Sequence, residues 1–191
     1  MRLVRRALIV GALAVLVSQP AEAGADTLTH RDAVGDVARS PIGSSTYTLA
    51  PARIEGDITS MRVQHGRRAI WISIRLRDLT TTTNGNFHRL AIKSDRRYRA
   101  IALDAFPGHW AGTAVVTNIH GVVVGCPVRH RIDYVANVVG FRVPRRCLGH
   151  QPSWVRVGAR TAVAGANYAY ADDAIARGYS ASLLLGKRVH R

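Results

Sequence analysis

Acidic residues are scarce in this sequence, which has ten Asp and two Glu among 191 residues. Three of them, Asp32, Asp36 and Asp57, lie in glycine-containing stretches before or between the first expected strands. Carboxylate oxygens on a flexible backbone are the ligands that Ca²⁺ prefers in proteins. The three aspartates are therefore our candidate calcium ligands, although no EF-hand spacing occurs.

The only adjacent acid pair is Asp172-Asp173. Loops at one end of a β-sandwich are close in space even when they are far apart in sequence. We therefore expect the three loop aspartates to approach one another at one end, together with Asp172 or Asp173. Converged carboxylates repel and need a cation. The preferred partner is a nearby arginine, Arg31 or Arg53, and calcium is the alternative.

The eight histidines are dispersed, and no His-x-His, His-x-x-x-His or Gly-x-Ser-x-Gly pattern occurs. Zinc ligation would need distant convergence, and a nucleophile elbow is not indicated. Histidines in turns are commonly solvated, which is the expectation for His65. We expect no catalytic residue. The alternative is a secreted hydrolase whose His/Asp site the sequence pattern does not reveal.

Two tryptophans are candidate ligand-binding residues. Trp71 alternates with Ile70 and Ile72 and so lies on the opposite face of its strand. Trp110 lies in a loop that also contains Phe106 and His109. An exposed indole can stack on a sugar ring. For Trp71 the preferred expectation is instead that a loop or the terminal segment covers it, because large apolar surface is usually buried.

The formal net charge is +15, and 25 of the 27 basic residues are arginine. Such a charge attracts polyanions at low salt, so an anionic envelope polymer, an acidic glycan, a lipid surface or nucleic acid is a possible partner. The preferred explanation is the codon usage of a GC-rich genome, which favours Arg over Lys. The arginines scatter along the chain and form no long run. Since no nucleic-acid recognition motif is present, sequence-specific nucleic-acid binding is not expected.

Residues 1–23 have the features of a signal peptide, and residues 24–191 then form one domain. An apolar run of 11 residues, 7–17, follows three arginines, and Ala21-Glu22-Ala23 offers a cleavage site. Because a bilayer span needs ~20 residues, an uncleaved anchor is the less favoured alternative. No later segment is apolar enough to span a membrane. We expect a monomer that is secreted or associated with the cell wall.

The only cysteines, Cys126 and Cys147, are predicted to form one disulfide, as is usual in an exported chain. The closed loop of 22 residues would contribute roughly 3 kcal/mol to stability in the chain-entropy model.

The stretch 54–79 predicts the centre of the fold, because apolar and polar residues alternate there over two strands. Eight to ten short strands, separated by turn residues and without an amphipathic helix, predict an all-β chain: a single antiparallel, jelly-roll-like β-sandwich. The expected strands are 47–49, 58–64, 69–77, 87–93, 98–104, 113–117, 122–126, 133–143 (one strand or a pair interrupted near residue 137) and 154–159. Residues 162–186 could hold a loop, a short helix or another strand.

Several motifs resemble those of a largely uncharacterised family of small exported actinobacterial proteins. They are Asp32-x-x-x-Asp36-Val37, Gly56-Asp57-Ile58, His65-Gly66-Arg67, Asp78-Leu79, Val143-Pro144-Arg145-Arg146-Cys147-Leu148 and Trp154-Val155-Arg156-Val157-Gly158. The Asp-rich opening also resembles family-nine carbohydrate-binding modules and DOMON-like sandwiches. That second resemblance implies a β-sandwich with calcium and a glycan as ligands. We therefore expect an exported, non-catalytic module that binds a glycan or another anionic envelope polymer.

Overall fold

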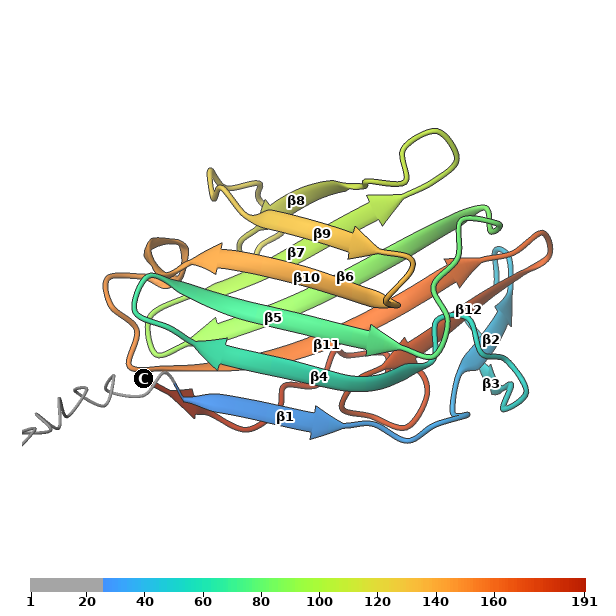
Figure 1. The fold of residues 1–191 in the computed structure, drawn as a ribbon, viewed down its shortest axis with the longest axis horizontal. Coiled ribbons are helices and arrows are strands. Elements are labelled where there is room, and N and C mark those ends of the chain that lie inside the picture. The colour runs from blue at the N-terminus through green and yellow to red at the C-terminus, as the bar shows by residue number, and fades with distance from the viewer. Residues whose placement is uncertain (1–25) are drawn as a thin grey trace, which may run out of the picture.

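The alternating residues of the central stretch form two strands of a five-stranded antiparallel sheet (Figure 1). The computed structural model describes residues 26–191. Apolar residues of these strands face inward and are buried, as the period of two requires. The order of this sheet is β1 (Thr27–Arg31), β4 (Ile58–His65), β5 (Ala69–Leu76), β10 (Val138–Pro144) and β9 (Arg129–Asp133).

A second antiparallel sheet packs against the first. Its order is β3 (Thr48–Leu49), β2 (Ala38–Pro41), β12 (Tyr168–Asp173), β11 (Trp154–Ala164), β6 (Gly85–Ser94), β7 (Tyr98–Ala105) and β8 (Thr113–Thr117). The short β13 (Val189–His190) pairs with the start of β11. The core lies between the sheets, where Ile72 of β5, Leu90 of β6 and Val157 of β11 belong to one buried cluster. The expected antiparallel β-sandwich is confirmed.

Several strands differ from their expected ranges, among them β11, which continues to Ala164, five residues beyond the expected end at residue 159. Residues 122–126 form no strand, only an isolated bridge between Thr117 and Val123. Val124 N still donates to Val116 O at 2.9 Å, but the backbone beyond it bonds locally, since Cys126 N donates to Val124 O and Val128 N donates to Cys126 O. Of the expected region 133–143, residues 138–143 belong to β10, and Asn137 lies in the turn before it at a positive φ of 54°. The partner strand β9 lies earlier in the chain than expected, and only its last residue, Asp133, falls in this region. Residues 162–186, for which a loop, a short helix or another strand was possible, contain β12.

The expected signal peptide, residues 1–23, lies outside the described residues. Among residues 26–191, no helix has the length and apolar character needed to cross a membrane. The only helical element in that range is the 3₁₀ helix η1 (Arg145–Leu148).

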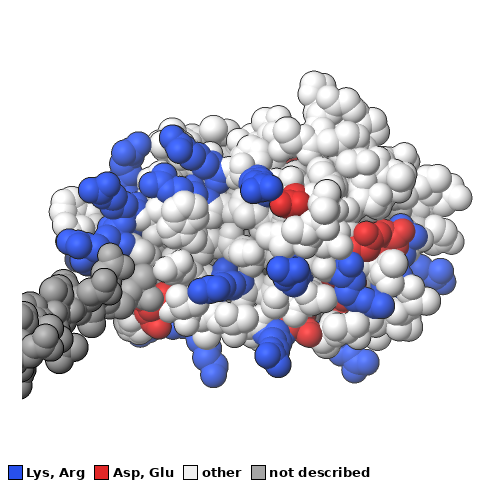
Figure 2. Space-filling view, viewed as in Figure 1, with Lys and Arg blue, Asp and Glu red and all other residues white. Residues whose placement is uncertain are grey.

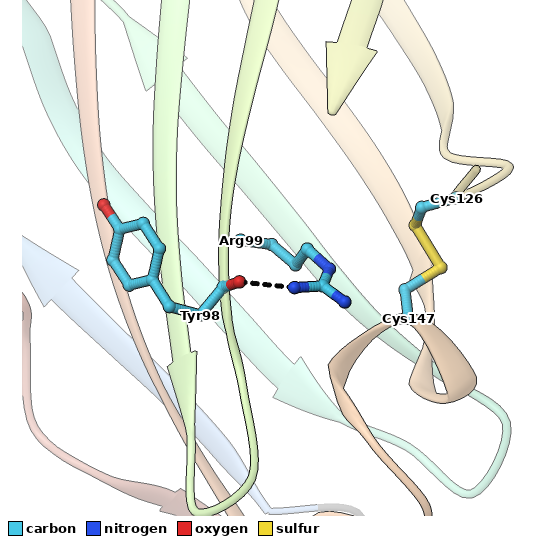
Figure 3. Close-up of a disulfide and its surroundings, with 4 residues drawn as sticks. All are labelled: Tyr98, Arg99, Cys126 and Cys147. Carbon is cyan, nitrogen blue, oxygen red and sulfur yellow. Dashed lines mark hydrogen bonds between the residues drawn. A yellow bond between two sulfur atoms is a disulfide. The ribbon is translucent and has the colours of Figure 1, made fainter. Parts of the chain in front are cut away.

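The predicted disulfide joins Cys126 to Cys147 of η1, with Cα atoms 5.6 Å apart (Figure 3). Arg99 lies beside it and donates to the carbonyl of Tyr98 at 2.7 Å. The bond closes the base of the β9–β10 hairpin, because both strands lie between the two cysteines.

Two histidines are buried between the sheets. His65, expected in a solvated turn, instead ends β4 and contacts Val189 O through Nδ1 at 3.2 Å. His88 of β6 contacts Thr161 Oγ1 through Nδ1 at 3.1 Å. Burial, aided by the charge of Arg89, lowers the pKa of His88 to about 3.

We therefore expect His88 to make the fold sensitive to acid. Its folded pKa lies below the unfolded value of ~6.5, so protons favour the unfolded chain and stability falls as the pH drops through 6.5. Between pH 7 and pH 5 the free energy of unfolding should fall by about 2 kcal/mol more in the wild type than in His88→Asn. Urea titrations at both pH values measure this difference, and equal losses in the two proteins would contradict it.

Candidate ligand-binding groove and aspartate cluster

The outer face of the five-stranded sheet carries a row of polar and aromatic side chains across four strands. Gln64 of β4 pairs with Trp71 of β5, Trp71 pairs with Arg142 of β10, and Arg142 pairs with Arg129 of β9. Side chains of directly paired residues lie on the same face of a sheet. Strand register therefore brings together one indole, two guanidinium groups and an amide.

A second row, two residues along each strand, runs parallel to the first. It consists of Arg62, Ser73, Gly140 and Arg131. Gly140 has no side chain, and a Cβ added there would approach nothing closer than Arg131 O at 4.0 Å. The two rows line an open groove of about 590 Å³, with His130, Ile72 and Phe141 also in its wall. We call it the Trp71 groove.

Trp71 is half exposed in this groove, with 50% of its surface accessible. The guanidinium carbon of Arg142 lies 5.3 Å from the ring centre. The expectation that a loop or the terminal segment covers Trp71 was wrong. Its cross-strand neighbours are Gln64 and Arg142, whose polar ends leave the indole in contact with solvent.

The Trp71 groove is strongly basic. Four of its lining residues are arginines and none is acidic: Arg62, Arg129, Arg131 and Arg142. Among the described residues only Arg131 of these four forms an ion pair, with Asp133 at 2.8 Å. Figure 2 shows Lys and Arg side chains over this face of the molecule, with few acidic ones between them.

A second group of arginines lines a separate hollow of about 760 Å³ at the end of the sandwich that contains the β4–β5 turn. Its members are Arg67, Arg68, Arg145, Arg146 and Arg191. Arg145 is held by the carbonyls of Arg67 and Pro152, at 3.0 and 2.8 Å. This hollow has no aromatic lining residue.

Trp110, the other candidate ligand-binding residue, does not line the Trp71 groove. Its ring meets Tyr134 edge-on, with centroids 6.1 Å apart, and its carbonyl accepts a hydrogen bond from Tyr134 Oη at 3.0 Å. It is partly buried. These contacts give Trp110 a packing role between the β7–β8 loop and the β9–β10 turn.

The aspartates gather at the opposite end of the sandwich from the arginine hollow. Asp36, Asp57 and Asp172 each place a carboxylate oxygen within 4.8 Å of the other two. Asp57 and Asp172 are 0% exposed and Asp36 is 3% exposed. We call these three residues the aspartate cluster. Asp36 and Asp57 are two of the three candidate calcium ligands, and Asp172 is one of the two residues, Asp172 or Asp173, that were expected to approach them.

Backbone amides orient the cluster. Asp57 Oδ2 accepts from Gly35 N at 2.9 Å, and Asp172 Oδ2 accepts from Ile58 N at 2.7 Å. Asp36 Oδ2 accepts from Gly178 N at 3.1 Å. The three carboxylates therefore join the loop after β1, the start of β4 and the end of β12.

Asp32 lies beside the cluster and is not among the three closest carboxylates. Burial, with the nearby charges of Asp36, Asp173 and Asp57, raises the pKa of Asp32 to about 7. Burial, with Asp32 and Asp36, raises the pKa of Asp172 to about 8.

The arginines expected to pair with the aspartates were the wrong ones. Arg53 pairs with Glu55 at 2.8 Å, and no ion pair involves Arg31 among the described residues. Asp57 is paired with Arg77 at 3.0 Å instead. Asp173 is paired with Arg160, its cross-strand neighbour, at 2.9 Å.

The chain matches no known family model, and no match was found among curated proteins or solved structures. The resemblances drawn from the sequence motifs therefore stay predictions.

Proposed function

We propose that this protein is a non-catalytic module that binds an acidic glycan or a related anionic polymer in the Trp71 groove, at or outside the cell envelope. The single observation that carries the proposal is a half-exposed indole in an open groove whose lining includes four arginines and no acidic residue. The indole offers an apolar face to a sugar ring, and the arginines offer charged donors to its acidic groups.

The arrangement explains why the groove is preferred over the arginine hollow. Exposed charge pairs contribute little each and are screened by salt. In the Trp71 groove, the indole also offers a ring face to the ligand. Salt does not screen the apolar contact between this ring face and a sugar ring. A ligand with both sugar rings and carboxylates would use both features, so binding should weaken with salt without disappearing.

A hydrolase is the alternative function. Catalytic carboxylates must reach a substrate, whereas the three cluster aspartates are at most 3% exposed. His65 and His88 are buried as well. These observations favour the binding function. Turnover of esterase, protease or glycosidase substrates that vanished on changing one histidine would favour the hydrolase.

The test uses an oligogalacturonate and its methyl ester, which share a sugar backbone but differ in charge. At ~50 mM salt we expect the acidic oligomer to bind more tightly than the ester. Trp71→Ala should weaken the binding of both oligomers about tenfold, which corresponds to ~1.4 kcal/mol. Arg142→Ala should weaken mainly the binding of the acidic oligomer. Isothermal titration calorimetry measures all of these affinities.

Two matched controls separate the groove from bulk charge. Arg39→Ala removes one positive charge from β2 in the other sheet, and Trp110→Ala removes the other candidate tryptophan. Both should bind within twofold of the wild type. If Arg39→Ala weakened binding as much as Arg142→Ala, net charge would explain the binding and the groove would not.

A further inference from the structure

We infer that Asp36, Asp57 and Asp172 form a structural calcium site that joins the loop after β1 and the start of β4 to the end of β12. This inference is independent of the proposed glycan function, because the cluster and the Trp71 groove share no residue. The two can therefore fail separately.

The geometry suits calcium. Ca²⁺ binds oxygen ligands at about 2.3–2.6 Å, so two oxygens on one ion can be up to about 5 Å apart. The three carboxylate oxygens lie within 4.8 Å of one another. Mg²⁺ dehydrates reluctantly and usually keeps several waters, whereas Ca²⁺ accepts a cage of protein oxygens. Because the three carboxylates are almost fully buried, the site favours Ca²⁺.

Unpartnered oxygens within the cluster point independently to a missing ligand. Asp36 Oδ1 and Asp57 Oδ1 have no hydrogen-bond partner among residues 26–191, and both side chains are more than nine-tenths buried. Most buried polar atoms in proteins have a partner. A cation or a proton would satisfy these oxygens, and backbone amides already orient the opposite oxygen of each carboxylate.

The charges around the cluster also favour a divalent ion. Five carboxylates converge at this end: Asp32, Asp36, Asp57, Asp172 and Asp173. Two arginines form ion pairs with them, Arg77 with Asp57 and Arg160 with Asp173. Arg177 lies close enough to act on Asp36 without an ion pair among the described residues. In a chain with a formal charge of +15, this end keeps an excess of carboxylates.

The competing explanation is that protons alone neutralise the carboxylates. Calcium requires deprotonated ligands, so calcium and protons compete for the same oxygens. The two explanations differ in what added calcium does near pH 7.5. A calcium site gives saturable binding and a higher melting temperature, whereas a proton-sharing cluster gives neither.

The experiment treats the exported chain with chelator, removes the chelator, and titrates it with Ca²⁺ and then Mg²⁺ at pH 7.5. We expect one Ca²⁺ per chain by calorimetry, and a rise of roughly 5–10 °C in melting temperature when calcium exceeds its dissociation constant ~100-fold. Mg²⁺ should raise it by less than ~2 °C. Absence of both calcium heat and a melting shift would overturn the inference in favour of protons only.

Asp36→Asn is the diagnostic variant. It keeps the shape of the side chain and an oxygen for Gly178 N, the one hydrogen-bond donor to its carboxylate in the described structure. It should fold and lose the calcium response. Asp133→Asn, a matched loss of one carboxylate on the β9–β10 hairpin, should keep the full response. A calcium response of equal size in Asp36→Asn and the wild type would also overturn the assignment.

Discussion

The free energy of unfolding of a Cys126→Ser/Cys147→Ser double variant is expected to be roughly 2–5 kcal/mol lower than that of the wild type. The bond closes a 22-residue loop whose interior is the β9–β10 hairpin, so its loss frees that hairpin in the unfolded ensemble. The expected loss exceeds that of a typical surface substitution, which is within ±0.5 kcal/mol. Denaturant titration under oxidising conditions measures it.

The same variant should also weaken ligand binding. β9 lies at the edge of its sheet and pairs only with β10, and it supplies Arg129 and Arg131 to the groove.

A Cys126→Ala/Cys147→Ala variant is the control for the polarity of serine at the buried Cys147. We expect the serine and alanine double variants to lose the same free energy of unfolding. A loss below ~1 kcal/mol in both would contradict a stabilising role for the bond.

The second large effect is expected at Gly158 of β11. A Cβ added there would lie 2.0 Å from Leu184 O and 3.0 Å from Leu184 C, both backbone atoms of the segment that covers the strand. Gly158→Ala must therefore displace that segment or bend the central strand of the larger sheet. We expect a loss of more than ~3 kcal/mol, at the upper end for overpacking.

Gly140→Ala is the matched control for this substitution. Gly140 also lies within a strand, but its added Cβ would meet only Arg131 O at 4.0 Å. A stability change within ~1 kcal/mol is expected there. Thermal melts of both variants make the comparison. Equal stability of the two variants would show that the close approach of residues 183–184 does not restrict Gly158.

The strands with strong alternation were predictable from sequence. β4, β5 and β7 lie within about one residue of their expected ranges, because large apolar residues recur at about every second position there. β9 was missed since Arg-His-Arg-Ile-Asp at a sheet edge contains one large apolar residue. β12 was ambiguous because its alanines and tyrosines give no strong period.

The candidate site was predictable only in part. Alternation placed Trp71 on the outer face, but the neighbouring arginines depend on strand order and register, which local patterns do not contain. Asp172 joins the cluster while Asp173 pairs with Arg160, since successive strand residues point to opposite faces. Sequence alone could not choose between the two.

The most direct test of the central claim maps the ligand onto the protein. The ¹⁵N-labelled protein is titrated with oligogalacturonate at ~50 mM salt while backbone amide and indole resonances are followed by NMR. We expect the largest shifts at the Trp71 indole and at the amides of Gln64 and Arg142, which flank it across the strands. Largest shifts at Arg145–His150 or on the eight-stranded sheet, with the Trp71 indole unmoved, would contradict it.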